Sequence, residues 1–197
     1  PKPEGTTRFC IDYRRLNAVT ASDAYPLPRI NQLLTEVAGK KFYTALDLAS
    51  SFHQITLDAE AARKRAFVCG MGLFEFLRLS FGMKNAPATF QRMMTDLMSP
   101  VFHRGVRVFI DDILIFSDTW EEHAESVRQV FAILAQNGLT VKDSKCSYGG
   151  DAVEWLGHQV GEFGLRPAPS KVRAVRDLKE PTTKVEAVST VAFFSYY

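Results

Sequence analysis

The stretch VFIDDILIFS, residues 108–117, sets two adjacent aspartates, Asp111 and Asp112, among apolar residues. A buried carboxylate is so costly that it must pair, bind a cation or stay at the edge of the water. Adjacent strand residues point to opposite faces, so a regular strand could not solvate both aspartates on one side. The stretch therefore predicts a tight β-hairpin, with strands over 107–110 and 113–116 and both aspartates at the tip. Taken alone, a purely structural turn is the simpler interpretation, because Asp is a common turn former.

Length and composition bound the class of protein. The chain has 197 residues, 46% of them hydrophobic, which is enough for one large domain or two small ones. It has no apolar run near the length of about 18 residues that a membrane span needs, and no N-terminal signal pattern, so we expect a soluble intracellular protein without a membrane partner. Cys10, Cys69 and Cys146 lie far apart without CxxC spacing, which argues against a disulfide framework and a zinc site.

The net charge of +2 says less than its distribution along the chain. One region is basic and contains Glu75 as its sole acid: Arg63, Lys64, Arg65, Arg78 and Lys84. Residues 109–126, by contrast, contain six carboxylates and no Lys or Arg. A basic region beside an acidic focus suits a polyanion held near a metal, although ordinary solvated faces explain these charges equally well.

Apolar periodicity predicts mixed helix and strand. Strands are expected over 8–13, 42–48, 66–69 and 74–77, with short strands near 139–142 and 153–160. Helices are expected near 30–38, 59–65, 85–98, 118–137, 170–178 and 184–195. Asn85 is the expected N-cap of the third helix. The fourth helix is expected to bury one apolar face, formed by Trp120, Ala124, Val127, Phe131 and Leu134.

From residue 42 onward, without the basic insertion, the element order is strand, helix, hairpin, helix, strand. This is the ferredoxin-like split βαβ arrangement, which places the first strand beside the hairpin in one antiparallel sheet. Asp47, at the end of that strand, then comes close to Asp111 and Asp112. Three converging carboxylates repel one another unless a divalent cation neutralises them, and an oxygen-only site suits Mg²⁺ or Mn²⁺. Two such ions stabilise both oxygens of an in-line phosphoryl displacement, which points to nucleotidyl transfer.

Seven segments also carry a family resemblance. They are RFCIDYRRLN, YPLPRINQLL, FYTALDLASSFHQI, RKRAFVC, FGMKNAPATFQRMM, FIDDILIFS and WLGH. In this order and spacing they resemble the reverse transcriptase of Gypsy-class LTR retrotransposons over nearly the whole chain. The resemblance implies an α+β polymerase palm, built on a ferredoxin-like split βαβ sheet with helices on one face, with partial fingers and the start of a thumb.

The resemblance divides the chain between these parts. Residues 1–41 would be partial fingers, 42–58 the palm strand with the first catalytic aspartate, and 59–84 a fingers insertion. Residues 85–150 would be the palm helix, the Asp-Asp hairpin and a second helix, residues 151–165 the primer-grip hairpin, and residues 166–197 the start of a truncated thumb. Because the chain would begin inside the fingers and stop inside the thumb, we expect a palm-centred fragment.

Site roles are also implied by the resemblance. Asp47, Asp111 and Asp112 would be catalytic metal ligands together with Leu48, and Lys145 would act near the leaving pyrophosphate. The implied nucleotide-binding residues are Arg8, Ala49, Ser50, Ser51, Phe52 and Gln91. The implied nucleic-acid-binding residues are Arg63, Lys64, Arg65, Lys84, Phe109, Ile110, Leu156, Gly157 and His158. Phe52 stands at the steric-gate position, where a bulky ring clashes with a ribose 2′-hydroxyl.

Several positions depart from the family pattern. The unusual residues are Thr7 for Trp, Phe109 for Tyr, Ser51-Phe52 for Gly-Tyr and Ser80 for Pro. None of them removes a predicted metal ligand, so catalysis is still expected. Without the resemblance, Phe52 would be interpreted as a core aromatic and Gln91 as a surface helix residue.

The predicted function is that of an RNA-directed DNA polymerase within a retrotransposon Pol polyprotein. A primer 3′-hydroxyl would attack a dNTP on an RNA or DNA template, with two Mg²⁺ ions as cofactors and Mn²⁺ as their substitute. The alternative is a truncated, non-catalytic remnant that binds nucleic acid. An RNA-templated RNA polymerase is disfavoured by the aromatic residue at position 52. The resemblance implies a cytoplasmic virus-like particle or the nucleus as location, and it leaves the oligomeric state open.

Overall fold

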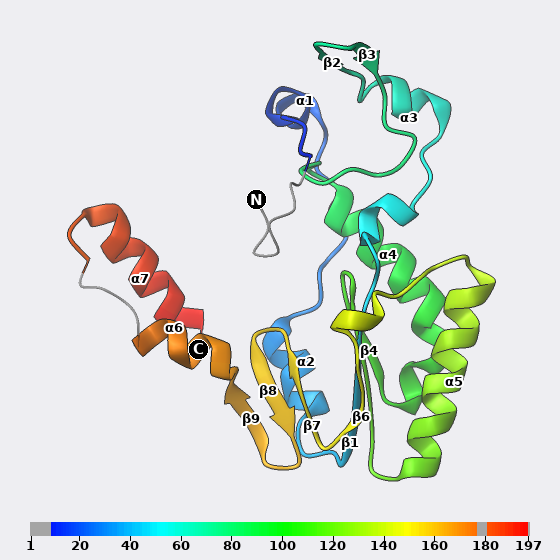
Figure 1. The fold of residues 1–197 in the computed structure, drawn as a ribbon, viewed down its shortest axis with the longest axis vertical. Helices are drawn as coiled ribbons and strands as arrows, with labels where there is room; N and C mark the ends of the chain where they lie inside the picture. The colour runs from blue at the N-terminus through cyan, green and yellow to red at the C-terminus, as the bar shows by residue number, and fades with distance from the viewer. Residues whose placement is uncertain (1–8, 177–180, 197) are drawn as a thin grey trace.

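A four-stranded antiparallel sheet forms the centre of the computed structural model, which describes residues 9–176 and 181–196 (Figure 1). Its strand order is β4-β5-β1-β6. These strands span Phe42–Asp47 (β1), Val106–Phe109 (β4), Asp112–Ser117 (β5) and Ser147–Gly150 (β6). The first strand therefore lies beside the hairpin, as the split βαβ arrangement predicts, and the α+β palm is confirmed.

Alternation along β1 and β5 directs two apolar sets to opposite faces of the sheet. Leu46 and Ile113 point into a core shared with α4 (Ala86–Met98) and α5 (Trp120–Gln136). Leu114 and Phe116 point into a second core, shared with α2 (Ile30–Val37) and a hairpin of β7 (Ala152–Trp155) and β8 (His158–Gly161). Figure 1 shows these two layers on either side of the sheet. The palm helices α4 and α5 thus share one face, as predicted.

The residues at the N-cap positions of α5 and α4 make different hydrogen bonds. The α5 helix is capped by Thr119, whose hydroxyl accepts a hydrogen bond from the N–H of Glu122. Asn85 stands at the N-cap position of α4 but makes no capping hydrogen bond. Its side chain instead donates to the carbonyl of Ala21 and accepts from the N–H of Asp23, so it ties the preceding loop to the helix.

The tip of the Asp-Asp hairpin differs from the prediction by one residue. Phe109 pairs with Asp112, so the two-residue turn consists of Ile110 and Asp111. Ile110 has a φ of 54°, a positive value of the kind that two-residue hairpin turns require. Asp111 therefore lies at the tip, while Asp112 is the first residue of β5 and faces β1.

A lobe at one end of the palm contains α1 (Arg14–Val19), α3 (Ala59–Arg63), β2 (Phe67–Cys69) and β3 (Gly72–Phe74) (Figure 1). The short 3₁₀ helix η1 (Ser51–Gln54) follows β1 and packs against the palm core through Phe52. The strand predicted over 8–13 is wrong for residues 9–13, which form no strand. The strand predicted over 74–77 lies earlier, because β3 pairs directly with β2 across a tight turn.

Two further predictions change in the second half of the chain. Residues 139–142 form no strand beyond an isolated bridge between Leu48 and Val141. The predicted face of α5 is right only in part: Leu134 is buried and Val127 and Phe131 pack against the core, but Trp120 is exposed. The helix also buries His123, Ser126 and Val130, which were not predicted. Apolar periodicity also did not predict η2 (Ser99–Arg104), η3 (Asp143–Lys145), β6 and β9 (Gly164–Pro167). The single strand predicted near 153–160 is two strands, β7 and β8, joined by a turn.

The chain continues into two helices, α6 (Pro169–Arg176) and α7 (Lys184–Tyr196), close to their predicted positions. Among the described residues, no helix combines the length and the apolar character needed to cross a membrane.

Candidate active site

Asp47 and Asp112 lie directly opposite each other at the same end of β1 and β5. The backbone of Asp112 pairs with Phe109 on β4, so its pairing with Asp47 is of the non-hydrogen-bonded kind, in which side chains approach most closely. Opposite residues share a face, and here it is the face that carries α2 and the β7–β8 hairpin. The register of the sheet therefore brings together two of the three predicted ligands.

Asp111 completes the acidic group from the adjacent turn. Its Oδ2 atom accepts a hydrogen bond of 3.0 Å from the hydroxyl of Ser51. Ser51 is buried at the start of η1, immediately after the left-handed residue Ser50. The turn after β1 and the turn after β4 are thus joined through a carboxylate, which fixes where Asp111 lies relative to Asp47.

Lys145 supplies the positive charge at this site. Its Nζ atom lies 2.8 Å from Oδ2 of Asp47, and the N–H of Lys142 donates to the backbone carbonyl of Asp47. The hydrogen bond to Asp47 raises the pKa of Lys145. The ammonium group predicted to act near a leaving group therefore stays charged, in direct contact with a carboxylate of the site.

The crowding of charge is greatest at Asp112. Burial, reinforced by the charges of Asp111 and Asp47, raises the pKa of Asp112 to about 6, while Lys145 opposes the rise. A buried carboxylate among like charges is poorly stabilised in its ionised form. The site therefore favours further positive charge, which either a proton or a cation can supply.

A cavity of about 180 Å³ opens beside Asp47, Asp112 and Lys145. Its opposite wall is the β7–β8 hairpin, including Glu154 and the turn of Leu156 and Gly157. Both turn residues have positive φ, 47° and 76°, as a type I′ turn requires. Leu156 and Gly157, predicted to belong to the primer grip, therefore line the same cavity as the carboxylates, whereas His158 of the same predicted motif does not line it.

Four lining residues of this cavity were not among the predicted site residues: Ala45, Leu46, Glu154 and Trp155. The last two carry polar side-chain atoms. Glu154 adds a carboxylate to the wall, and the buried Trp155 has an indole N–H with no hydrogen-bond partner among the described residues. Trp155 belongs to the WLGH string that carries the resemblance, so the sequence contained a signal for it. Nothing in the pattern singled out Glu154.

The residues after Asp47 are held by the backbone of residues 140–142. The N–H of Ala49 donates to the carbonyl of Thr140, and Gln54 donates to the carbonyl of Ala49. The Ala49 amide is thus engaged within the protein. The bridge between Leu48 and Val141 uses the Asp47 carbonyl and the Ala49 N–H, so it does not involve the Leu48 carbonyl.

Phe52 lies on η1 and packs edge-on against Phe81 and Phe90, with ring centroids 5.2 Å and 5.4 Å away. It is partly buried, and its role as a steric gate stays a prediction. Gln91 was predicted to contact the nucleotide. Its side chain is instead fully buried and hydrogen-bonded to the hairpin at Val108 and Ile110.

The predicted basic residues come from α3, from the residues directly after it and from the loop before α4. Arg63 and Lys64 are exposed, and Lys64 pairs with Glu60. Lys84 donates to the carbonyl of Thr20, while the Nη1 atom of Arg65 is buried with no partner among the described residues. Arg8 and the departure at Thr7 lie outside the described residues.

The suitability of the site for metal ions rests on its donor atoms. Within residues 9–176 and 181–196, no group of three or more His, Cys, Asp or Glu side chains is arranged as a metal site. Two carboxylate oxygens of the site already have partners within the protein, Lys145 at Asp47 and Ser51 at Asp111. The oxygen-only set and the charge crowding at Asp112 nevertheless suit Mg²⁺ or Mn²⁺ chemically.

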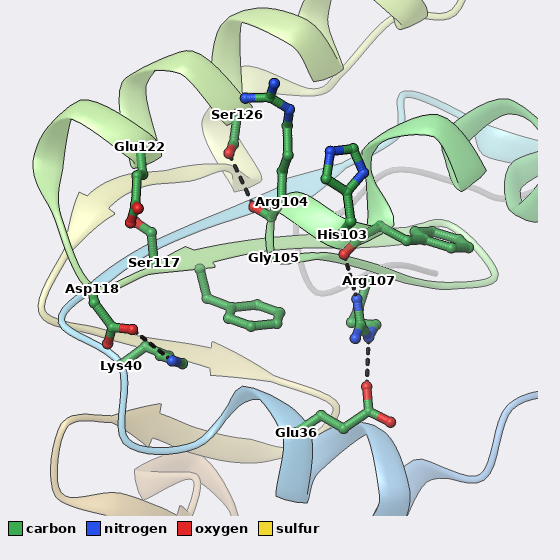
Figure 2. Close-up of a pocket in the computed structure, with 12 residues that line it drawn as sticks. Glu36, Lys40, His103, Arg104, Gly105, Arg107, Ser117, Asp118, Glu122 and Ser126 are labelled. Carbon is green, nitrogen blue, oxygen red and sulfur yellow. Dashed lines mark hydrogen bonds and ion pairs between the residues drawn. The ribbon is translucent and has the colours of Figure 1, made fainter.

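A larger cavity, of about 610 Å³, lies at the other end of β5 (Figure 2). Its charged side chains largely satisfy one another, because Lys40 pairs with Asp118 and Arg107 with Glu36. Figure 2 shows both pairs across the cavity. Each carboxylate of these two pairs has a cationic partner, unlike Asp112, which lies among other carboxylates.

Comparison with known proteins places this geometry in a family context. The family profile described as "Reverse transcriptase (RNA-dependent DNA polymerase)" matches residues 1–160. The Pol polyproteins of the Drosophila melanogaster transposons 297 and opus are 39% and 41% identical over 96% and 100% of this chain, which spans 18% and 20% of their lengths. A foamy viral protease-reverse transcriptase in complex with double-stranded DNA aligns over the whole chain and 34% of its own, with a TM-score of 0.93 and 26% identity.

Proposed function

This chain belongs to the reverse transcriptase (RNA-dependent DNA polymerase) family of LTR retrotransposon Pol polyproteins, and we propose that it forms the catalytic core of template-directed DNA synthesis. The observation that carries the proposal is the pairing of Asp47 with Asp112 beside Asp111 at the hairpin tip. The primer 3′-hydroxyl would attack the α-phosphate of a dNTP, and pyrophosphate would leave.

The residues of the site have separate tasks in this reaction. Asp47, Asp111, Asp112 and the carbonyl of Leu48 would hold two Mg²⁺ or Mn²⁺ ions, which when bound offset the phosphate charge and favour an ionised 3′-hydroxyl. Lys145 keeps a proton next to Asp47, where it can neutralise or protonate the departing pyrophosphate. Binding of a cation by Asp47 would release Lys145 for that task.

Nucleic acid would occupy the space between the carboxylates and the β7–β8 hairpin. The turn of Leu156 and Gly157 lines the cavity next to Asp112 and would hold the primer end through its backbone. A second foamy viral structure, in complex with an RNA/DNA hybrid, aligns with a TM-score of 0.89 and 25% identity, which supports a nucleic-acid template as partner. The exposed Arg63 and Lys64 would contact backbone phosphates.

Replacement of Asp111 by Asn tests this proposal, because it removes one charge at constant size. Primer extension with dNTPs and Mg²⁺ is measured in the longer polypeptide that contains this sequence. Asp111→Asn is expected to lower the rate by about 100-fold or more. Asp118→Asn is the matched control, since this exposed aspartate follows the opposite end of β5 and pairs with Lys40. Unchanged extension by Asp111→Asn would exclude the mechanism.

A further inference from the structure

The side chain of Gln91 is enclosed within the palm. It lies on α4 and is 0% exposed, so no atom of it is available to a bound nucleotide. Its Oε1 atom accepts a hydrogen bond of 2.7 Å from the N–H of Ile110. Its Nε2 atom donates to the carbonyl of Val108 at 3.4 Å and to the hydroxyl of Thr95 at 3.2 Å. The backbone partners fix the amide orientation, because an N–H can only donate and a carbonyl can only accept.

These contacts lie on the outer edge of the sheet. Val106 to Phe109 all pair with β5, and in an antiparallel ladder hydrogen-bonded pairs alternate with non-hydrogen-bonded ones. Gly105 accepts a hydrogen bond from the N–H of Phe116, so Gly105, Arg107 and Phe109 direct their polar groups towards β5. The C=O of Val108 and the N–H of Ile110 therefore point away from β5, to the side of β4 where the described residues place no further strand. The Gln91 amide binds both groups, as a neighbouring peptide unit would.

The turn that Gln91 holds is conformationally costly. Ile110 is β-branched and has a φ of 54°, a region that such residues rarely occupy. A strained turn persists only where its surroundings determine it. Gln91 stabilises this conformation through its hydrogen bond to Ile110, the residue directly before Asp111. Ser51 separately holds the carboxylate of Asp111.

We propose that Gln91 is a positioning residue, which holds the Ile110 turn and thereby sets the position of the Asp111 carboxylate for nucleotidyl transfer. The catalytic consequence rests on the proposed function, whereas the structural part does not. Gln91 then acts through the hairpin, and the affinity for the incoming nucleotide does not depend on it.

Amide hydrogen exchange tests the structural part on this chain without any substrate. In Gln91→Met, which is similar in size but cannot make these hydrogen bonds, the Ile110 amide is expected to exchange at least about tenfold faster relative to the Leu114 amide in β5. Met98→Ala is the matched control, because Met98 is a fully buried residue of the same helix in the same core. That control should accelerate both amides together. Equal acceleration of both amides in Gln91→Met would overturn the proposal.

Steady-state kinetics in the longer polypeptide test the catalytic part. Gln91→Met is expected to lower kcat about 10- to 100-fold, because small misplacement of a catalytic group is costly, and to leave the dNTP KM within about threefold. A raised KM at unchanged kcat would overturn the proposal in favour of a nucleotide contact. Thr95→Val removes one anchor of the amide and should act in the same direction, more weakly, if Gln91→Met does not fold. A wild-type protein without activity would refute the proposed function, and the exchange ratio would still decide the role of Gln91.

Discussion

Acidification should weaken the fold through one buried histidine. His123 on α5 is 1% exposed, with Nε2 2.8 Å from the hydroxyl of Thr44 and Nδ1 3.1 Å from that of Ser117. The Ser117 hydroxyl donates to the carbonyl of Thr119, so it accepts from Nδ1–H. The Thr44 hydroxyl accepts from the N–H of Gly149 and donates to Nε2. This network selects the neutral imidazole with its proton on Nδ1.

The buried environment of His123 determines the direction and the upper limit of the change in unfolding free energy on acidification. Burial lowers the pKa of His123 below its ordinary value. The unfolded chain therefore binds more protons in mild acid, and the stability contributed by neutral His123 is present above a pH of about 6.5 and lost as the pH falls through the folded pKa. Between pH 6.5 and 5 the loss from one histidine is at most about 2 kcal/mol, at about 1.36 kcal/mol per pH unit.

Urea unfolding of the wild type and of His123→Gln at pH 7.5 and 5.0 measures this loss. His123→Gln stays neutral at both pH values, so its free energy of unfolding should fall less on acidification, by up to about 2 kcal/mol. His103→Gln, at an exposed histidine, is the control and should follow the wild type. Equal losses in the wild type and in His123→Gln would refute the argument.

Further predictions concern three other positions. Phe52→Ala should raise the ratio of ribonucleotide to deoxynucleotide incorporation in competition assays, and an unchanged ratio would remove its assignment as a steric gate. Gly105→Ala should cost more than about 4 kcal/mol in urea unfolding, because the added Cβ would overlap a backbone oxygen of β5, whereas Gly138→Ala, with nothing within 4 Å, should cost about 1–2 kcal/mol for its positive φ alone. Ser51→Ala should lower kcat about 10- to 100-fold, because it loses the hydrogen bond to the charged Asp111, and kcat within twofold of the wild type would contradict this.

The strand order of the palm could be predicted because its signal is one of apolar periodicity. β1, the hairpin and the two palm helices each bury a continuous apolar set, and the split βαβ connection leaves few arrangements for them. That order alone brings Asp47 towards the hairpin. The acidic group was therefore within reach of sequence reasoning before any side-chain contact was known.

Buried polar residues could not be predicted from the sequence, because their burial depends on hydrogen-bond partners far away in the chain. The predicted face of α5 followed its apolar residues, yet the helix buries His123 and Ser126. Ser126 is satisfied by the carbonyl of Arg104 and His123 by hydroxyls on two strands. Gln91 on α4 is a further buried polar residue of this kind. Its position in the sequence, next to Phe90, does not indicate that its side chain binds the edge of β4.

The position of Asp112 shows why periodicity also could not fix the register of the hairpin. In the predicted turn, Ile110 would pair with Ile113 and Val108 with Ile115, whereas in the structure Val108 pairs with Ile113. The two registers differ by two residues, so both keep the valines of β4 on the α4 side, and the apolar pattern favours neither. Two contacts that the apolar pattern does not show distinguish the registers. The Gln91 side chain accepts a hydrogen bond from the N–H of Ile110, and at the other end of β4 the carbonyl of Gly105 accepts one from the N–H of Phe116 in β5. With these two contacts, Asp112 lies within the sheet opposite Asp47, and only Asp111 remains in the turn. The two adjacent aspartates therefore approach the acidic site from different positions, one from a strand and one from the hairpin tip.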